Sequence, residues 1–207
     1  MIQPETGLLA TFFSGILRLL GWRMVGAFPD CKKFIMIGAP HTSNWDFFYA
    51  MLFKYASGLH FKWIGKATLF KPPFGGLFLR LGGIPVWREK KSNFVAQISE
   101  LFAQSEHLVI AIAPEGTRQQ TAYWKTGFYY MAVGAQVPIV LGFLDYARKQ
   151  IGLGPVLQPT GDIQADFKQI QDFYADKRGA HPVNQNPITL LPPIEDTITE
   201  PQNMEKS

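Results

Sequence analysis

A histidine and an aspartate stand five positions apart near the start of the chain, as His41 and Asp46. They lie between two apolar runs, 34–37 and 47–53, so we expect a buried strand, a turn, and then a helix that opens near 42–44. Because five residues rotate by about 140° on an ideal helix, the side chains can meet only if Asp46 reaches back from the first turn. In that geometry the carboxylate would fix the tautomer of the imidazole and leave the other ring nitrogen available as a general base.

The same spacing also has a purely structural explanation. Thr42, Ser43 or Asn44 could cap the helix, and an acidic residue such as Asp46 in the first turn is favoured by the helix dipole. The pair by itself leaves both interpretations open.

A second group of polar residues follows another predicted strand. Residues 107–112 form a continuous apolar run, as expected for a strand buried on both faces, and lead into Pro-Glu-Gly-Thr-Arg at 114–118. The threonine and Arg118 are suited to hold phosphate, since a guanidinium can bind two phosphate oxygens at once, and Arg88 could add a second charge. Alternatively, Glu115 pairs with one of the two arginines and only fixes a loop.

Predicted strands and helices alternate along the chain, which favours an α/β fold: a layered, mixed and largely parallel sheet flanked by helices. His41, Arg88 and Arg118 each follow a predicted strand, and in such sheets functional sites gather at the strand ends. We expect strands at 34–37, 60–65, 82–88, 107–112, 138–144 and 156–157, and helices at 47–53, 74–81, 93–104, 127–135 and 166–174.

The composition narrows the class of protein. With 207 residues, 47% of them hydrophobic, the chain can bury a sizeable core and is too apolar to be disordered. The net charge of +4 favours anionic partners, but the basic residues are dispersed and no nucleic-acid motif occurs, so we expect no nucleic acid. The single cysteine, Cys31, excludes an internal disulfide, and His41 and Asp46 have no third metal ligand in view, so we expect no metal.

The first 29 residues are expected to form a separate apolar helical segment that associates with a membrane. A helix over 8–22 would rise roughly 22 Å, short of the roughly 30 Å hydrocarbon core, so it would lie in the interface. An ordinary core helix is the alternative. The side chains expected to face acyl chains are Phe12, Phe13, Ile16, Leu17, Leu20 and Trp22, with Arg18 and Arg23 at the headgroups.

The remaining chain divides into one α/β domain and a tail. We expect the domain at 30–181 and a loose tail at 182–207, where Pro, Asn, Gln and Glu dominate.

Four blocks of this sequence resemble the glycerolipid acyltransferases of the lysophosphatidic acid (1-acyl-sn-glycerol-3-phosphate) acyltransferase type. His-Thr-Ser-Asn-Trp-Asp at 41–46 matches the His-x4-Asp block, and Gly-Ile-Pro-Val-Trp-Arg at 83–88 matches the second block. Pro-Glu-Gly-Thr-Arg at 114–118 and Val-Pro-Ile-Val at 137–140 match the third and fourth. The resemblance spans roughly residues 30–145.

This resemblance implies an O-acyltransferase that needs no other cofactor. It would move a fatty acyl group from a thioester, on coenzyme A or acyl carrier protein, to the free hydroxyl of lysophosphatidic acid. His41 would act as general base and Asp46 would orient its ring. Lys66 or the backbone amides near Gly116 would stabilise the oxyanion.

The resemblance also implies how the acceptor is bound. Arg88, Thr117 and Arg118 would hold the acceptor phosphate, and Glu115 would orient the acceptor or its arginine. Four positions depart from the usual family pattern and could shape the pocket for the acceptor: Pro40, Trp87, Ala113 and Leu141.

Lysolipid and product both partition into bilayers, so the resemblance implies an enzyme on the cytoplasmic face of an anionic membrane, peripheral or monotopic. Two alternatives stay open: an acyltransferase for another lysolipid (a lysophospholipid or lyso-aminolipid), and a non-catalytic lipid-binding protein. The second alternative leaves the spacing of His41 and Asp46 unexplained. A hydrolase is disfavoured because the chain has no Gly-x-Ser-x-Gly motif.

Overall fold

The structure is a computed structural model that describes residues 7–86 and 94–191. The strands are β1 (Arg23–Val25), β2 (Lys33–Ala39), β3 (Lys62–Lys66), β4 (Gly83–Val86), β5 (Leu108–Ile112), β6 (Ile139–Asp145) and β7 (Gln150–Leu157). The helices are α1 (Leu8–Leu19), α2 (Trp45–Ser57), α3 (Gly75–Arg80), α4 (Phe94–Ala103), α5 (Gly127–Ala135) and α6 (Ile163–Tyr174), with short 3-10 helices η1 (Ala67–Phe70) and η3 (Pro182–Asn184).

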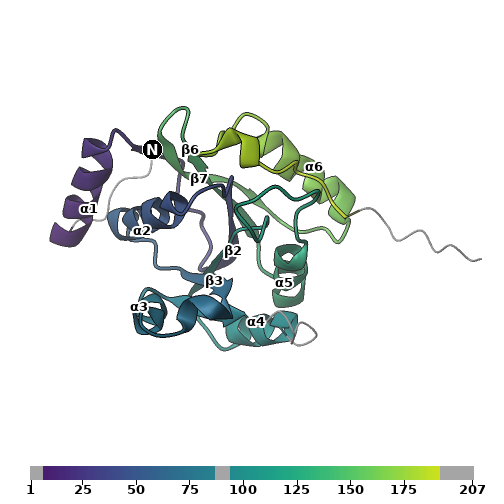
Figure 1. The fold of residues 1–207 in the computed structure, drawn as a ribbon. Helices are drawn as coiled ribbons and strands as arrows, with labels where there is room; N and C mark the ends of the chain where they lie inside the picture. Colours follow the sequence, from purple (N-terminus) through teal and green to yellow (C-terminus); the bar gives the residue numbers. More distant parts are fainter. Residues whose placement is uncertain (1–6, 87–93, 192–207) are drawn as a thin grey trace, which may run out of the picture.

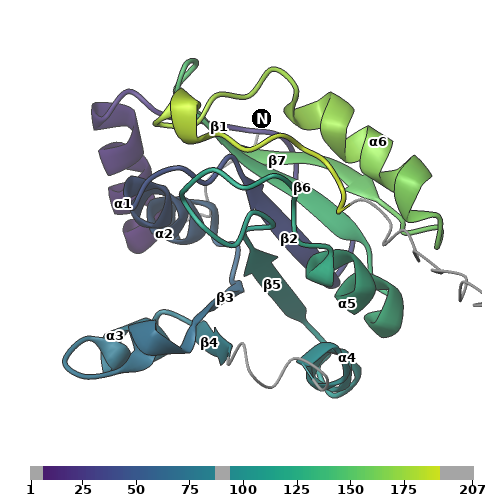
Figure 2. The same ribbon diagram turned by 45° about the vertical axis from the view of Figure 1, so that its right-hand side comes forward.

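The strands form one mixed, largely parallel sheet in the order β1-β7-β6-β2-β5-β3-β4. From β6 to β4 all neighbouring strands are parallel, whereas β7 runs antiparallel to β6. Helices α1 and α2 lie on one side of the sheet and α5 and α6 on the other (Figure 1, Figure 2). The predicted α/β class is therefore confirmed.

Alternating side chains of β2 supply the two halves of the core. Ile35 and Ile37 are buried against α4, α5 and α6, while Phe34 and Met36 are buried against α1 and α2. A central strand covered on both faces needs apolar residues at every position, which explains the unbroken apolar run that predicted it.

The edge of the sheet formed by β1 and β7 differs from the prediction. Strand β1 was not predicted, and β7 runs six residues further toward the N-terminus than the pair expected at 156–157. The two backbones approach so closely that a Cβ at Gly26 would lie 1.9 Å from the carbonyl oxygen of Leu153, and one at Gly152 would lie 1.8 Å from that of Val25. Glycines permit this approach but are poor strand formers, which hid the N-terminal part of β7 from sequence patterns, and β1, which ends just before Gly26, is only three residues long.

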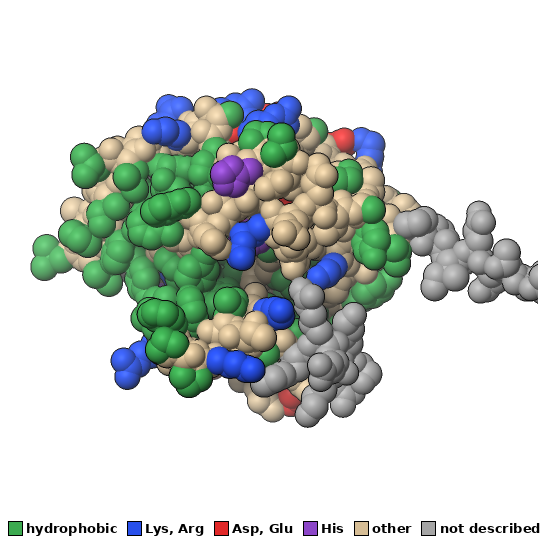
Figure 3. All heavy atoms as spheres, in the orientation of Figure 1, with side chains coloured by type: hydrophobic (Ala, Val, Ile, Leu, Met, Phe, Trp, Pro, Cys, Tyr) green, Lys and Arg blue, Asp and Glu red, His purple; other side chains and the backbone are tan. Residues whose placement is uncertain are grey.

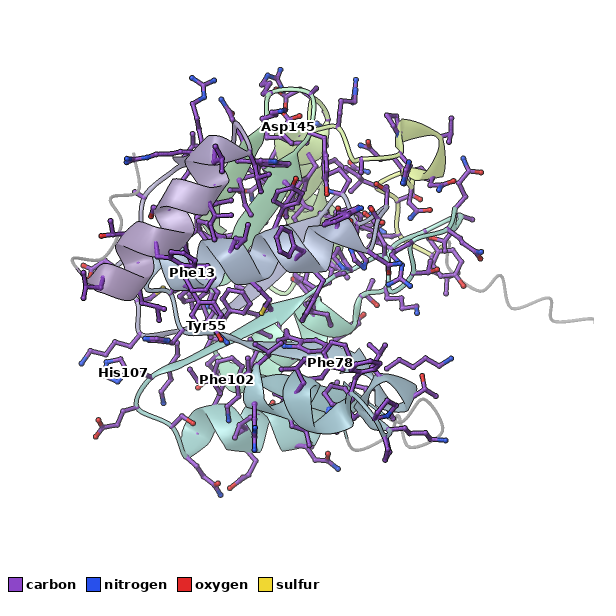
Figure 4. The ribbon with its side chains drawn as sticks, turned by 60° about the vertical axis from the view of Figure 1, so that its left-hand side comes forward. Phe13, Tyr55, Phe78, Phe102, His107 and Asp145 are labelled. Atoms are coloured by element: carbon purple, nitrogen blue, oxygen red, sulfur yellow. The ribbon has the colours of Figure 1, made fainter. Side chains whose placement is uncertain are left out.

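Helix α1 forms as predicted but has one buried and one exposed side. The ring of Phe13 stacks on Tyr55 of α2 at 4.9 Å, and the two lie side by side in Figure 4. Leu17 and Trp22 are 1% and 3% exposed, so the expectation that they face lipid is wrong: they pack against α2 and the sheet. Phe12, in contrast, is 62% exposed. No helix in the described ranges is long and apolar enough to cross a membrane.

The first ten residues of the expected tail are not loose. After η3, Asn186 is buried, and Ile188 and Leu190 pack partly against the core. The backbone amide of Trp124 donates to the carbonyl oxygen of Thr189 at 2.9 Å. The chain over 182–191 thus returns across the domain, and positions 192–207 lie outside the described residues.

Candidate active site

Three neighbouring parallel strands end at the same edge of the sheet and bring the polar residues together. Strand β2 lies between β6 and β5. His41 follows β2, Glu115 follows β5 and Tyr146 follows β6. Residues more than 70 positions apart in sequence therefore meet at one site, as expected for the carboxyl ends of parallel strands.

The first contact joins His41 to Asp46. Nδ1 of His41 lies 3.1 Å from Oδ2 of Asp46. Asp46 lies in the first turn of α2, and its side chain reaches back to the histidine as predicted. The backbone amides of Thr42 and Ser43 donate to the same oxygen at 2.8 and 2.9 Å. The Asp46 carboxylate can only accept a hydrogen bond, so Nδ1 of His41 carries the ring proton and donates it. Nε2 is then the unprotonated, basic nitrogen of the ring. The His41 side chain is 22% exposed, so substrate can reach it.

The other oxygen of Asp46 is also occupied. The hydroxyl of Tyr146 donates to Oδ1 at 2.6 Å. Burial alone would raise the pKa of Asp46, but hydrogen bonds from His41, Tyr146 and Ser43 outweigh burial and hold that pKa below its usual value. Burial and the adjacent carboxylate raise the pKa of Tyr146, which keeps its proton and remains a donor. Asp46 is therefore a fully hydrogen-bonded carboxylate beside the histidine.

Helix capping does not account for this arrangement by itself. Asn44 stands at the N-cap and makes no capping hydrogen bond with its side chain. Ser43 Oγ accepts from the amide of Trp45 at 3.2 Å, so a serine takes part of the capping role while Asp46 binds His41.

Glu115 lies beneath the histidine instead of facing a substrate. It is 1% exposed; Oε1 accepts from the backbone amide of His41 at 2.9 Å, and Oε2 accepts from Nδ2 of Asn186 at 3.0 Å. It forms no ion pair with Arg118 in the part of the chain that the structure describes. These contacts give Glu115 a structural role, and the expected role of orienting the acceptor or an arginine stays a prediction, since Arg88 lies outside the described residues. Burial raises the pKa of Glu115 to about 7 against the opposing effect of these donors.

An open pocket of about 350 Å³ adjoins the pair formed by His41 and Asp46, called the dyad, and is lined in part by the exposed Arg118. The half-buried Thr117 accepts from the amide of Gln119 through Oγ1 at 3.2 Å and lies in the same loop. The pocket is lined by Thr42, Ser43, Asn44, Trp45, Arg118, His181 and Asn184. It therefore combines polar groups with a guanidinium directly beside the first turn of α2.

The remaining predicted site residues are less directly engaged. Gly116 adopts a positive φ of 65°, and its amide donates to the carbonyl of Ala113 at 3.1 Å, so this amide is already used in the turn. Lys66 ends β3, two strands from β2, with an exposed side chain. Arg88 lies outside the described residues.

Comparisons with known proteins agree with this architecture. The model of the family described as Acyltransferase matches residues 27–140. The chain belongs to the acyltransferase family. It also resembles the crystal structure of the 1-acyl-sn-glycerophosphate (LPA) acyltransferase PlsC from Thermotoga maritima, with a TM-score of 0.57 and 17% identity over 80% of this chain and 74% of that one. Among curated proteins none matches the chain.

Four residues around the candidate site were not predicted from the sequence. Tyr146 and Asn186 bind the two carboxylates, and His181 and Asn184 line the pocket. All four lie beyond residue 140, where the family match ends. No local motif in the sequence marks them.

Proposed function

We propose that this acyltransferase moves a fatty acyl group from a thioester of coenzyme A or acyl carrier protein to the free hydroxyl of lysophosphatidic acid. The observation that carries the proposal is the 3.1 Å contact between His41 Nδ1 and Asp46 Oδ2. This contact fixes the tautomer of the His41 ring and leaves its basic nitrogen accessible to substrate.

The chemistry needs one proton carrier and no covalent acyl-enzyme. Nε2 of His41 removes the proton from the acceptor hydroxyl as its oxygen attacks the thioester carbonyl carbon. The C–O bond forms and a tetrahedral oxyanion results, for which Lys66 is the candidate cation. When this collapses, the C–S bond breaks and the thiolate takes the proton from His41, which returns to its neutral form. Throughout, the Asp46 carboxylate stabilises the imidazolium.

The pocket beside the dyad supports a phosphorylated acceptor. Arg118 can present two parallel N–H donors to a phosphate, and Asn184 and His181 line the same space. A phosphate held there would place the acceptor beside the loop that contains His41. The similar protein from Thermotoga maritima is itself named as an acyltransferase for 1-acyl-sn-glycerophosphate.

The surface supports contact with a membrane. Hydrophobic side chains gather over α1 and α2 and, separately, over α3 (Figure 3). They are exposed in an aqueous environment, an arrangement typical of proteins that dock on lipid. The exposed large hydrophobic residues on these helices, at their caps or on η1 are Leu8, Leu9, Phe12, Leu19, Leu20, Trp45, Phe48, Leu69, Phe74, Leu77 and Leu79. We place the enzyme on the cytoplasmic face of an anionic membrane, where lysolipid is available.

The test is thiol release from acyl-CoA, and from acyl-ACP in parallel, by the full-length protein in liposomes. Lysophosphatidic acid, a phosphate-free monoacylglycerol and a zwitterionic lysophospholipid are supplied separately, with one sample lacking acceptor. We expect release that requires lysophosphatidic acid and yields the diacyl product. Release without any acceptor would indicate a thioesterase, and no release with any donor would support the lipid-binding alternative. Preference for the zwitterionic lysophospholipid would move the assignment to that acceptor.

A further inference from the structure

Two carboxylates hold His41, and each is held in turn by a residue from the C-terminal third of the chain. Asp46 contacts the His41 ring with Oδ2 and accepts from Tyr146 with Oδ1 at 2.6 Å. Glu115 contacts the His41 backbone with Oε1 and accepts from Asn186 with Oε2 at 3.0 Å. The placement of the histidine thus depends on residues outside the segment that matches the acyltransferase family.

Packing sets the direction of the Tyr146 hydroxyl. Tyr146 follows directly after β6, and its amide donates to the carbonyl of Arg178 at 2.9 Å. The preceding Asp145 is fully buried and accepts from backbone amides of the same turn, at the end of the strand (Figure 4). The tyrosine ring packs against Trp22 and Tyr49, with centroids at 4.9 and 5.9 Å. The hydroxyl therefore reaches Asp46 from a fixed ring.

Both ends of the Asn186 side chain are used. Its Oδ1 accepts from the amide of Thr121, and its Nδ2 donates to Glu115. The orientation of the amide is therefore set, because exchanging oxygen and nitrogen would break both contacts. A second contact joins this C-terminal segment to the loop between β2 and α2: the backbone amide of His181 donates to Thr42 Oγ1 at 3.1 Å.

We infer that Tyr146 and Asn186 are positioning residues of the acyltransferase, and that the chain beyond residue 140 completes its active site. The roles assigned to them rest on the proposed function of His41 as general base. Each acts through a carboxylate: Tyr146 on the ring of the histidine and Asn186 on its backbone.

The two contacts have a chemical consequence besides rigidity. A donor on Oδ1 spreads the charge of Asp46 and weakens its attraction for a protonated imidazole. The other ionisable groups near this contact are Glu115, buried under His41, and Tyr49, beside Tyr146. If the Tyr146 hydroxyl is removed, the carboxylate should attract the imidazolium more strongly, and the ring should keep its proton to a higher pH.

The first experiment compares Tyr146→Phe with wild type and with Tyr55→Phe. The ring of residue 146 is retained, so its packing against Trp22 and Tyr49 should persist. Tyr55 lies on α2 with Asp46, and its hydroxyl makes no hydrogen bond within the described ranges, so Tyr55→Phe is a matched control. The pH titration of the histidine ring signals is followed by NMR in the full-length protein, with the His41 signal identified by its absence in His41→Ala.

We expect the titration midpoint of the His41 signal to move to higher pH in Tyr146→Phe and to stay in place in Tyr55→Phe. The acid limb of the kcat/KM profile should move in the same direction, with kcat reduced by roughly tenfold. An unchanged midpoint would overturn the role of Tyr146, even if the variant is less active or less stable. The NMR readout needs no substrate, so it remains decisive if the assigned acceptor or donor is wrong.

The second experiment uses Asn186→Asp, which keeps the shape of the side chain but places a carboxyl group against Glu115. Asp46, His41 and the hydroxyl of Tyr174 are the other ionisable groups near Glu115. Two adjoining acids retain one proton between them and repel when it leaves. We expect activity that falls as pH rises, over a range where wild type is at its plateau. The matched control, Thr189→Val, removes a hydrogen bond to Ala122 that also joins this segment to the 113–125 loop. A profile of Asn186→Asp parallel to wild type would overturn the role of Asn186.

Discussion

Glu115 accepts a 2.9 Å hydrogen bond from the backbone amide of His41, across 74 positions of sequence. This contact holds the backbone at the start of the loop between β2 and α2, while the carboxylate of Asp46 holds the imidazole ring of His41. A buried acid in this place also gives the protein a measurable dependence on pH.

The free energy of unfolding should decrease as pH rises from 4.5 to about 7. In this range Glu115 is ionised in the unfolded chain but keeps its proton in the folded protein. Burial raises the pKa of Glu115 from 4.5 to about 7, so between these values the native state binds the proton more tightly. The unfolding free energy should therefore fall by about 3 kcal/mol across this window because of this group. Asp46, whose pKa is lowered, acts in the opposite sense and only at lower pH.

The measurement is denaturant unfolding of wild type and Glu115→Gln from pH 5 to 8. The variant lacks the titrating group, so its stability should be lower but flatter over this range. Parallel curves for the two proteins would show that Glu115 does not carry the raised pKa.

Substitution of Arg118 by alanine should mainly raise the KM for a phosphorylated acceptor. Arg118 is exposed in the pocket beside the dyad and makes no contact with His41 or Asp46 in the described part of the chain. Loss of a charge-assisted contact of about 1.5–3 kcal/mol corresponds to a roughly 10- to 100-fold rise in KM. Arg80→Ala, on the exposed surface of α3, is the control. Equal KM values for wild type and Arg118→Ala would remove the phosphate role.

His181 should contribute to the same acceptor pocket. Its side chain is exposed and lines the pocket together with Arg118 and with Trp45 of α2. His181→Ala should weaken competitive inhibition by glycerol 3-phosphate by about threefold to tenfold, the range of a typical hydrogen bond of about 0.5–1.5 kcal/mol. Thiol release with a phosphate-free acceptor should be unaffected, and equal losses with both acceptors would contradict a phosphate-specific role.

Helix α1 should contribute to membrane binding through its exposed side. Phe12 is 62% exposed, and a phenylalanine that enters the interface gains about 1.5–3 kcal/mol when fully buried. Phe12→Ser should reduce partition to anionic vesicles by about tenfold or more. Val133→Ser, on α5 at the opposite side of the sheet, is the matched control. Identical partition of the two variants would mean that α1 does not contact lipid.

The sequence was most informative where function depends on nearby residues. His41 and Asp46 are only five positions apart, so their spacing and the adjoining apolar runs were enough to predict their contact. The largely parallel direction of the central strands was predicted from the alternation of strands and helices along the chain, whereas the order of the strands in the sheet was not predicted.

Contacts between residues far apart in the sequence could not be predicted from the sequence. Glu115 was singled out by its motif, but its contacts with His41 and Asn186 were not predicted, because these partners lie 74 and 71 positions away. Tyr146 follows a strand that was predicted, yet nothing in a single tyrosine shows which carboxylate it will meet.

Composition misled where polar or small residues serve a packing role. Polar residues after Pro182 suggested a loose end, whereas Asn186 is buried because both ends of its amide are hydrogen-bonded. The apolar helix near the N-terminus suggested lipid contact all along one side, but Leu17 and Trp22 pack inside the protein.

The central claim is that His41 is the base that activates the acceptor hydroxyl. The most direct measurement is the kcat for thiol release with lysophosphatidic acid present, in wild type and in His41→Ala, after equal thermal stability has been established. The dyad predicts a loss of at least about 1,000-fold in the variant. A kcat for His41→Ala within tenfold of wild type would contradict the account.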